Sequence, residues 1–511
     1  KIMSIPHIED YYHTKVLMVD DQPFLAYAGE IHNSNCSQVD YFREHVLPKI
    51  NHLGLNTVIL PVYWEQIEKE EGQFDFHVFD EIIDLLRKEN LKAVVLWFGL
   101  WKNAKSSYIP AWMKENRKTY PFIKKEDQTP IYTITPLCQE AIEKDGYAFF
   151  KLMEHIKEKD QEHQTVIMVQ VENEIGCLST NRDYSEKANA MFAQEIPSDM
   201  QTLMSKKGTW EECFQADSHE MFMAYYFAKA IEYIAQCGKK IYPLPLIVNV
   251  WLKKTHEKAG QYPSGGPIQD KIDLYHYLAP SIDLVCPDIY VTNFREICDV
   301  YASQGALFIP ETRQDIHYIS HAIYAYTQYP CLGYSPFGIE DFANEDSQET
   351  NNRHIMKLLG IVKEAFHPEG TQYYLKKIYQ QLSSFEKILL KKRGTDDLWS
   401  FLNDNEEKCI ERTMNDLKIN VQFLDNQDCL PIGVGCILKE DKYLYIYGMR
   451  FFASLFSLKT NEYIGILELE EGHFENGQWI VERVLNGDEQ YFIAVGNNPR
   501  FLRVHYHQYS E

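Results

Sequence analysis

The chain has 511 residues, of which 45% are hydrophobic and 24% charged, with a formal net charge of −23. This length suits one large domain with a smaller one, or three small domains. The acidic balance argues against nucleic acid and against an anionic membrane surface as partners, because both attract basic surfaces. No apolar run approaches the ~20 residues that a membrane-spanning helix requires, so no membrane partner is expected.

The eleven cysteines are scattered along the chain without a C-x-x-C pair. Their odd number and their spacing indicate neither a disulfide framework nor a zinc ribbon. Several lie inside apolar segments, where a free cysteine acts as a small hydrophobic residue, and this favours a reducing compartment. We therefore expect a cytoplasmic protein, or a periplasmic or secreted one if a signal peptide preceding Lys1 has been removed.

Strands and helices alternate over the first 370 residues. After a short strand at 16–19, apolar runs of strand length occur at 23–28, 57–62, 91–98, 166–171, 246–250, 282–286, 306–309 and 331–334. Helical spacing follows these runs at 39–53, 79–88, 139–158, 219–237, 268–277, 293–301, 319–327 and 351–365. Eight strand-then-helix units most simply close into a (β/α)8 barrel of the α/β class, which we assign to residues 1–370. No G-x-G-x-x-G follows the first strand, so a dinucleotide-binding fold is not favoured.

The sequence pattern changes after residue 370. A helical linker at 373–391 is followed by short segments rich in aromatic and aliphatic residues, separated by turn signals such as Glu475-Asn476-Gly477. This pattern predicts a C-terminal β-sandwich over residues 371–511. His505 and His507 form an H-x-H on one short strand without a third ligand nearby, so we expect no metal site there.

One stretch ends in two carboxylates. Residues 166–176 read V-I-M-V-Q-V-E-N-E-I-G, a buried strand followed by Glu172, Asn173 and Glu174. The period of two places Gln170, Glu172 and Glu174 on one face of this strand. A solvated acidic rim would explain the two carboxylates, but barrel enzymes keep their chemistry at the carboxyl ends of their strands.

The other strand ends are also polar and aromatic. The residues there are Glu30, His32, Trp64, Glu65, Trp101, Lys102, Asn103, Trp251, Asp288, Tyr290, Glu311, Phe337, Glu340 and Asp341. Carboxylates together with indole and phenol rings suit a sugar, whose hydroxyls take hydrogen bonds while its C–H face packs on aromatic rings. Glycoside hydrolysis requires two carboxyl groups across the scissile bond.

Glu174 and Glu311, which follow the fourth and seventh strands, are the catalytic pair that we favour. Asn173 can bind the 2-hydroxyl of the sugar. Glu172 is the alternative candidate to Glu174, and Glu340 is the alternative candidate to Glu311. Further candidate substrate-binding residues are Glu30, His32, Trp64, Trp101, Lys102, Asn103, Trp251, Tyr290 and Glu340. The alternatives are packing for the tryptophans, a loop salt bridge for Lys102, and a cap on the first strand for Glu30 and His32.

Several motifs resemble the retaining (β/α)8 glycosidases of clan A, and within it glycoside hydrolase family 35 β-galactosidases. The motifs are Q-V-E-N-E-I-G, the late E-T-R, G-E-I-H, Y-W-E with its E-x-G-x-F-D-F tail, and P-A-W at 110–112. G-E-I-H-N-S and W-F-G-L-W-K-N are similar to a bacterial branch that carries a C-terminal β-domain. The resemblance implies that Glu174 is the acid/base, Glu311 the nucleophile, Asn173 the 2-hydroxyl ligand and Tyr290 a neighbour of the nucleophile.

The expected activity is retaining, exo-acting removal of terminal β-D-galactosyl residues by double displacement, without a metal or organic cofactor. The chain departs from many relatives after the third strand, where W-F-G-L-W-K-N replaces C-A-E-W at positions that touch the outer hydroxyls of the sugar. Hydrolysis of a β-glucoside or α-L-arabinopyranoside therefore stays open, as does a non-catalytic carbohydrate-binding barrel. The expected partner is a carbohydrate, and assembly into a homo-oligomer stays open.

Overall fold

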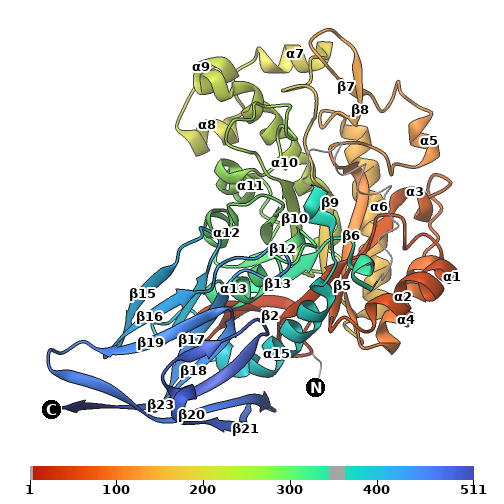
Figure 1. Cartoon of the computed structure of the whole chain (residues 1–511). Coiled ribbons are helices and arrows are strands. Elements are labelled where there is room, and N and C mark those ends of the chain that lie inside the picture. Colours follow the sequence, from red (N-terminus) through yellow and green to blue (C-terminus); the bar gives the residue numbers. More distant parts are fainter. Residues whose placement is uncertain (1–3, 344–362) are drawn as a thin grey trace.

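The computed structural model describes residues 4–343 and 363–511 and shows a barrel joined to a C-terminal β-domain (Figure 1). Eight strands form one sheet: β4 (Ala26–Glu30), β5 (Thr57–Tyr63), β6 (Lys92–Lys102), β9 (Val166–Asn173), β10 (Leu246–Trp251), β11 (Leu284–Asp288), β12 (Leu307–Thr312) and β13 (Cys331–Pro336). Almost every residue of these strands is buried, as expected for parallel strands covered on both faces.

The sheet closes into a ring. Its strand order is β11-β10-β9-β6-β5-β4-β13-β12, with parallel pairing between neighbours. The two ends meet where the Ile289 amide donates to the Glu311 carbonyl at 2.9 Å and Ile289 bridges to Thr312. The prediction of a (β/α)8 barrel is therefore confirmed.

Helices cover the outside of the ring. They are α4 (His77–Lys88), α6 (Gln139–Asp160), α10 (Ser218–Lys239), α11 (Ile272–Leu278), α12 (Phe294–Ala302) and α13 (Ser320–Gln328). Three predicted helices differ or cannot be compared. The helix expected at 39–53 is α1 (Val39–Tyr41), a π-helical turn (Phe42–Val46) and α2 (Leu47–Ile50). The helix expected at 268–277 begins with a 3-10 turn (Gln269–Lys271). The helix expected at 351–365 lies almost entirely outside the described residues.

Excursions follow the third and fourth barrel strands and stand above the carboxyl ends of the strands (Figure 1). The first contains α5 (Ala111–Lys114) and the hairpin β7 (Phe122–Lys124) and β8 (Pro130–Ile134). The second contains α7 (Glu186–Phe192), α8 (Ser198–Met204) and α9 (Trp210–Phe214). A short helix α3 (Trp64–Ile67) follows β5, and an antiparallel sheet of β1 (His7–Tyr11), β2 (Thr14–Val19) and β3 (Gln22–Phe24) precedes the barrel.

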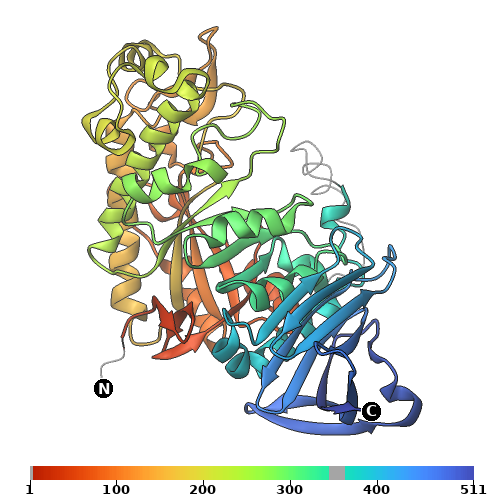
Figure 2. The same cartoon turned by 90° about the vertical axis from the view of Figure 1, so that its left-hand side faces the viewer.

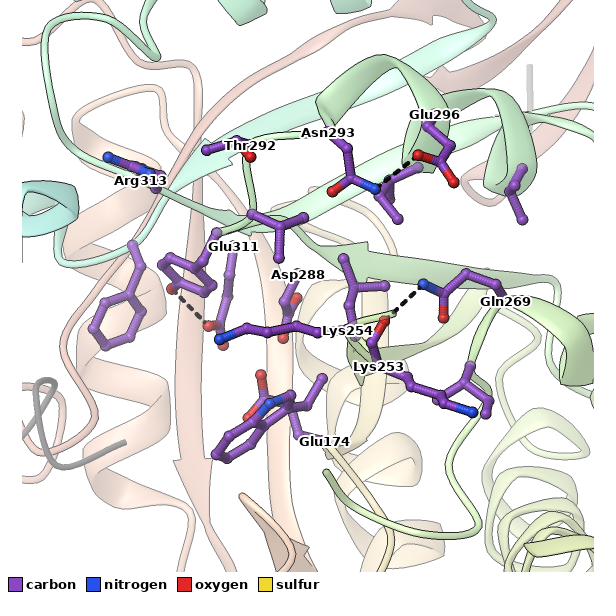
Figure 3. A pocket seen from close by; sticks show the side chains of 18 of the residues that line it. Glu174, Lys253, Lys254, Gln269, Asp288, Thr292, Asn293, Glu296, Glu311 and Arg313 are labelled. Carbon is purple, nitrogen blue, oxygen red and sulfur yellow. Dashed lines mark hydrogen bonds between the residues drawn. The ribbon is translucent and has the colours of Figure 1, made fainter. Parts of the chain in front are cut away.

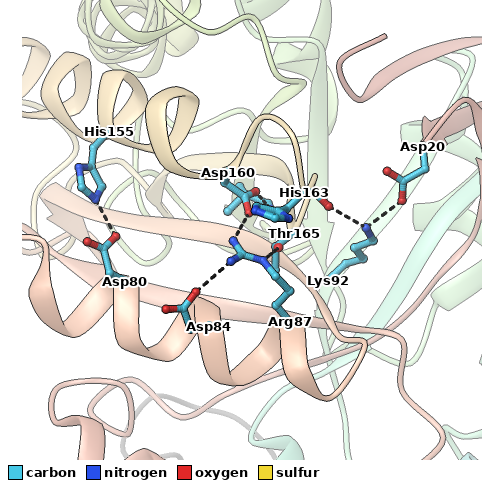
Figure 4. A network of polar contacts seen from close by, with 10 residues as sticks. Asp20, Asp80, Asp84, Arg87, Lys92, His155, Asp160, His163 and Thr165 are labelled. Atoms are coloured by element: carbon cyan, nitrogen blue, oxygen red, sulfur yellow. Dashed lines mark hydrogen bonds and ion pairs between the residues drawn. The ribbon is translucent and has the colours of Figure 1, made fainter. Parts of the chain in front are cut away.

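A polar network ties the amino-terminal ends of β6 and β9 to the helices beside them (Figure 4). The Arg87 guanidinium contacts Asp84 at 2.9 Å, the buried Asp160 at 2.8 Å and the Thr165 hydroxyl at 3.0 Å. Asp160 also accepts from the Val166 amide at 2.7 Å, at the first residue of β9. Polar contacts at this end of a barrel serve stability, because the chemistry of such folds lies at the opposite end.

The C-terminal domain consists of two antiparallel sheets packed face to face (Figure 2). One sheet has β14 (Leu398–Leu402), β17 (Val434–Glu440), β18 (Tyr443–Met449), β20 (Glu462–Glu475), β21 (Gln478–Leu485) and β23 (Arg500–Ser510). The other has β15 (Cys409–Met414), β16 (Leu417–Phe423), β19 (Phe451–Ser457) and β22 (Ile493–Val495). Ile437 and Ile446 of the first sheet share one buried cluster with Ile419 and Val421 of the second, which confirms the predicted sandwich.

The helix α15 (Thr371–Lys392) connects the barrel to the sandwich. On the barrel side, Tyr379 donates to the carbonyls of Ala28 and Tyr334, each at 2.8 Å. On the other side, the Tyr447 hydroxyl donates to Gln381 at 3.0 Å and Phe385 packs against sandwich rings. Because α15 contacts both parts, the expected boundary between residues 370 and 371 stays a prediction. Among the described residues, we find no helix that is both long and apolar enough to cross a membrane.

Candidate active site

Three carboxyl groups meet at the carboxyl ends of β9, β11 and β12. One oxygen each of Glu174, Asp288 and Glu311 lies within 4.8 Å of the others, and all three residues are nearly buried. They line a pocket of about 780 Å³ that opens at this end of the barrel (Figure 3). This is the location at which barrel enzymes carry their chemistry.

The end of β9 leaves regular strand geometry just before the catalytic candidate. Glu172 has φ 64° and Glu174 has φ 47°, both in the left-handed region that non-glycine residues rarely adopt. The period-two prediction that Glu172 and Glu174 share a face is therefore wrong, because these residues interrupt the pleat. Glu174 lines the pocket, whereas Glu172 interacts with the helix α6 outside the ring.

Glu172 belongs to a buried carboxyl pair with Asp145 of α6. Burial, reinforced by the charge of Asp145, holds the pKa of Glu172 well above its ordinary value. Asp145 accepts from the Trp97 indole at 2.7 Å and from the Leu100 amide at 2.9 Å, and Glu172 accepts from the Trp101 amide at 2.9 Å. Glu172 thus supports the end of β6 and does not compete with Glu174 for the role of acid/base.

Asn249 of β10 joins two of the three carboxyl groups and was not among the candidates from the sequence. Its side-chain oxygen accepts from the Glu174 amide at 2.8 Å, and its nitrogen donates to Asp288 at 2.7 Å. The available signal was an asparagine inside the apolar run L-I-V-N-V, because a buried amide requires partners.

Glu311 accepts hydrogen bonds on both of its oxygens. The Tyr290 hydroxyl donates to one oxygen at 2.9 Å, and the Asn173 amide donates to the other at 3.4 Å (Figure 3 shows the first). Lys102 donates to the side-chain oxygens of Asn173 at 3.2 Å and Asn103 at 2.9 Å. These contacts hold Glu311 and orient the Asn173 amide beside it.

The electrostatics of the site favour a protonated Glu174. Burial, and then the charge of Glu311, raise the pKa of Glu174 from 4.5 to about 7, against the opposing effects of Asp288 and Lys102. Burial followed by the charge of Glu311 also raises the pKa of Asp288 and of Glu30 well above their ordinary values. Glu30 is fully buried, and neither of its carboxyl oxygens has a hydrogen-bond partner among the described residues.

The sequence candidates divide into two groups. Lys102, Asn103, Trp251 and Tyr290 line the pocket together with Glu174 and Glu311, and Asn173 contacts Glu311. The structure also brings Asn33, Lys253, Lys254 and Arg313 to the pocket, which sequence reasoning did not single out. Their loop positions after the strands were the available signal.

Two tryptophans lie away from the pocket, contrary to the expectation that they bind sugar. The Trp64 ring is fully buried against Trp97 and donates to Glu68 at 3.0 Å. The Trp101 ring is also fully buried and donates to the Ile134 carbonyl at 2.9 Å. A ring with no exposed face cannot stack on a sugar, so both residues serve packing.

His32 and Glu340 contact each other beside the site, and neither residue lines the pocket. Glu340 accepts from the His32 amide at 3.0 Å and from Asn35 at 2.6 Å, and it is nearly buried. The His32 ring contacts Asp341 at 2.9 Å and packs edge-on against Phe337, which does line the pocket. Glu340 is engaged in these contacts and is not a second nucleophile candidate facing Glu174.

Comparison with known proteins gives two family matches. Residues 16–246 match the model of the glycosyl hydrolases family 35, and residues 375–496 match a domain of unknown function (DUF5597). A β-galactosidase of Xanthomonas manihotis is 26% identical over 184 residues, which cover 34% of this chain and 28% of that protein. The β-galactosidase-1-like protein 3 of Mus musculus is 29% identical over 177 residues, 32% of this chain and 24% of that protein.

The chain thus spans about a quarter of the length of the curated relatives that it matches. A solved β-galactosidase from Bacillus circulans sp. alkalophilus aligns over 94% of this chain and 99% of that one, at 11% identity and a TM-score of 0.49. The matched segment of 16–246 contains β4 through β9, including Glu174, whereas Glu311 lies beyond it. The resemblance indicated by the motifs is therefore confirmed for the first part of the barrel: residues 16–246 are similar to the glycosyl hydrolases family 35, and a separate model matches the C-terminal domain.

Proposed function

We propose that this chain is a retaining glycoside hydrolase that removes terminal β-D-galactosyl residues. The observation that carries the proposal is the close approach of Glu174 and Glu311, whose nearest carboxyl oxygens lie within 4.8 Å of each other. Retaining enzymes hold their two carboxyl groups ~5–5.5 Å apart, whereas inverting enzymes need ~6.5–9.5 Å to admit a water molecule. The family match and the names of the relatives support β-galactosides as substrates.

The two carboxyl groups take different roles because their surroundings differ. Glu311 attacks the anomeric carbon as a carboxylate, held by Tyr290 and Asn173. Glu174, with a pKa of about 7, is protonated in a large share of molecules at neutral pH and gives its proton to the departing oxygen. The bond between the anomeric carbon and the aglycone oxygen breaks as the bond to Glu311 forms.

The second displacement reverses these roles. Once Glu311 is esterified, its negative charge no longer raises the pKa of Glu174, so Glu174 loses its proton more readily and can act as a base. Water then attacks the anomeric carbon, Glu174 takes its proton, and Glu311 leaves as a carboxylate. Asn173 lies beside Glu311, where its amide can bind the 2-hydroxyl as the oxocarbenium-like charge develops.

Turnover of aryl glycosides tests the proposal. A panel of β-galactoside, β-glucoside, β-fucoside and α-L-arabinopyranoside is assayed, and the anomer released first is identified by NMR. Clear preference for the β-galactoside with release of the β-anomer is expected. Preference for another glycoside would overturn the sugar specificity, release of the α-anomer would overturn the retaining mechanism, and silence would favour a binding protein.

Two variants and two additives complete the design. Glu311→Gly is expected to lose activity, and azide is expected to restore cleavage of an activated aryl glycoside with formation of the α-glycosyl azide. Glu340→Gln is the matched control, because Glu340 is also buried near the mouth but does not line the pocket. Three carboxylates at this spacing could also ligate a hard divalent cation, so the assay is repeated with a chelator, and full activity is expected.

We also propose that the protein works in the cytoplasm. All eleven cysteines are free thiols in the structure, which fits a reducing compartment. Cell fractionation with antibody detection tests this location, and recovery in the periplasmic or secreted fraction would overturn it.

A further inference from the structure

One wall of the pocket is aliphatic, and it lies on the side of β10 and β11. Its residues come from the last position of β10, from the segments that follow β10 and β11, from residue 268 and from α12: Trp251, Leu252, Ile268, Val291, Ile297 and Val300. Leu252, Ile268 and Ile297 are nearly buried, whereas Trp251, Val291 and Val300 are half-buried. We name this set the aliphatic wall. The proposed mechanism does not use it.

The wall lies where the leaving group would depart. The ring order places β10 next to β9, which ends at Glu174, and places β11 next to β10. Trp251 pairs in register with Asp288, directly beside the acid/base. Lys102, Asn103 and Asn173 belong to β6, β9 and the segment between them, so the groups that can bind the sugar hydroxyls lie on the other side of Glu174.

Three polar side chains beside the wall are engaged with protein atoms. The Gln269 amide donates to the Lys253 carbonyl at 3.2 Å, and the Asn293 amide donates to Glu296 at 3.0 Å, as Figure 3 shows. Asp270 pairs with Lys271 at 2.9 Å. A second sugar ring in this space would bring several hydroxyls against methyl and methylene groups, and each buried hydroxyl left without a partner costs affinity.

The chemistry of the wall suits an apolar group instead. Sugars pack their C–H faces on aromatic rings, and Trp251 is the single aromatic ring of the wall. Aliphatic side chains gain affinity by removing apolar area from water, without directional requirements. The pocket volume of about 780 Å³ exceeds what one sugar ring occupies and lies within the range of pockets that bind drug-sized ligands.

We propose that the aliphatic wall is a subsite for an apolar aglycone, so that the preferred substrates are glycosides of alkyl or aromatic alcohols and not disaccharides. The inference rests on the proposed function, because it assigns the leaving-group side of the same pocket. Lys254 lines the same pocket and is exposed, and in the view of Figure 3 its side chain extends across the pocket. The aglycone enters beneath it, between α12 and the segment after β10.

A homologous series of inhibitors tests the subsite. Alkyl 1-thio-β-D-glycosides of the sugar preferred in the panel are compared from methyl to octyl, with the inhibition constant as the readout. Each methylene that reaches the wall is expected to tighten binding about threefold to fourfold, the factor that corresponds to ~0.8 kcal/mol per buried CH₂. An inhibition constant independent of chain length would overturn the inference.

A double variant at the wall separates apolar binding from catalysis. Val291→Thr with Val300→Thr keeps the shape of both half-buried side chains and adds two hydroxyls to the wall. The gain per methylene is expected to shrink, while the inhibition constant of the methyl compound stays unchanged. Val481→Thr, at an exposed position of the C-terminal domain, is the matched control and should leave the whole series as in the parent protein.

Substrate comparison provides the second readout. The expected result is a kcat/KM for the octyl or phenyl glycoside that exceeds that of the matching disaccharide by at least tenfold, lost in the double variant. A disaccharide hydrolysed as well as the octyl glycoside would refute the aglycone inference while leaving the proposed function intact. Failure to hydrolyse or bind any glycoside of the panel would refute the proposed function and this inference with it.

Discussion

The raised pKa of Glu174 predicts the alkaline limit of the proposed activity. A glutamic acid with the ordinary pKa of 4.5 would be protonated in only about 0.3% of molecules at pH 7, whereas a pKa of about 7 leaves about half of them protonated. The structure therefore supplies about 150 times more of the acid form at neutral pH. We expect kcat/KM to fall above about pH 7, by tenfold per further pH unit.

Substitution of Glu174 by Gln tests this assignment. With a phenyl glycoside, whose leaving group needs protonation, the loss in kcat/KM at pH 6 is expected to be about 10²–10⁴-fold, the usual contribution of general acid catalysis. With a 2,4-dinitrophenyl glycoside, whose leaving group departs without a proton, the loss should be far smaller. The decline above pH 7 should disappear from the pH profile of the variant.

Glu386 offers a matched control at a distance from the site. Its pKa is also raised to about 7, mainly by burial, and the Tyr27 hydroxyl donates to it at 2.7 Å, between α15 and β4. Glu386→Gln should leave the alkaline decline of kcat/KM unchanged. A decline that persists in Glu174→Gln, or one that vanishes in Glu386→Gln, would refute the assignment of this pKa to the acid/base.

The same pKa carries a cost in stability. Because the folded-state pKa of Glu174 exceeds its unfolded value, the native state holds a proton that the unfolded state releases, and stability falls as pH rises from 4.5 to about 7. At 1.36 kcal/mol per pH unit, the loss reaches about 3 kcal/mol above pH 7. Glu174→Gln should therefore unfold at higher denaturant than the parent protein at pH 8, with the difference smallest near pH 4.5.

Three further experiments test the framework of the site. Tyr290→Phe removes the hydrogen bond to Glu311 and should lower kcat about 10- to 100-fold, as loss of a bond to a charged group implies, with little change in KM in steady-state assays. Asp145→Asn leaves one of its two donors, the Trp97 indole or the Leu100 amide, unpaired and should cost about 1–3 kcal/mol in urea unfolding. Glu172→Gln keeps an oxygen that can accept from the Trp101 amide and should keep the fold, so equal loss in both variants would refute this difference between the two carboxyl groups. Gly99→Ala would place a Cβ 2.5 Å from carboxyl oxygens of Asp145 and Glu172 and should cost about 1–3 kcal/mol of stability, with lower activity. Gly496→Ala meets nothing within 4 Å and should change neither stability nor activity. Similar unfolding of the two variants would show that the two carboxyl groups can move aside without cost.

The barrel and the two catalytic candidates could be predicted because their signals are local. The barrel strands are continuous apolar runs, a pattern that indicates a sheet covered on both of its faces. A carboxylate directly after such a run must lie at one mouth of the ring, which is how Glu174 and Glu311 were found. The packing of Trp64 and Trp101 was not predictable, because it depends on partners far along the chain, the Trp97 ring for Trp64 and the Ile134 carbonyl for Trp101.

The aliphatic wall also escaped prediction, for a different reason. Ile297 and Val300 were assigned correctly to a helix, but helical spacing marks a face without saying whether it covers the sheet or a pocket. That distinction depends on the path of the segment after β10, which contains no regular element before the 3-10 turn at Gln269–Lys271. The path of the irregular segments therefore determines whether a helix face covers the sheet or lines a pocket.

Backbone strain at the ends of β6 and β9 is the part of the site that sequence periodicity misjudges most. Glu172, Glu174, Asn103 and Ala104 all have left-handed φ values between 47° and 64°, which cost of order 1–3 kcal/mol each unless the surroundings enforce them. The two segments enforce each other, since the Asn103 amide donates to the Asn173 carbonyl at 3.1 Å and the Ala104 amide to the Glu174 carbonyl at 3.0 Å. Regular pleating would send Glu172 and Glu174 to the same side. The strained backbone instead sends one carboxyl group to support β6 and the other to the pocket, so the strain is what separates the structural carboxyl group of Glu172 from the proposed acid/base Glu174.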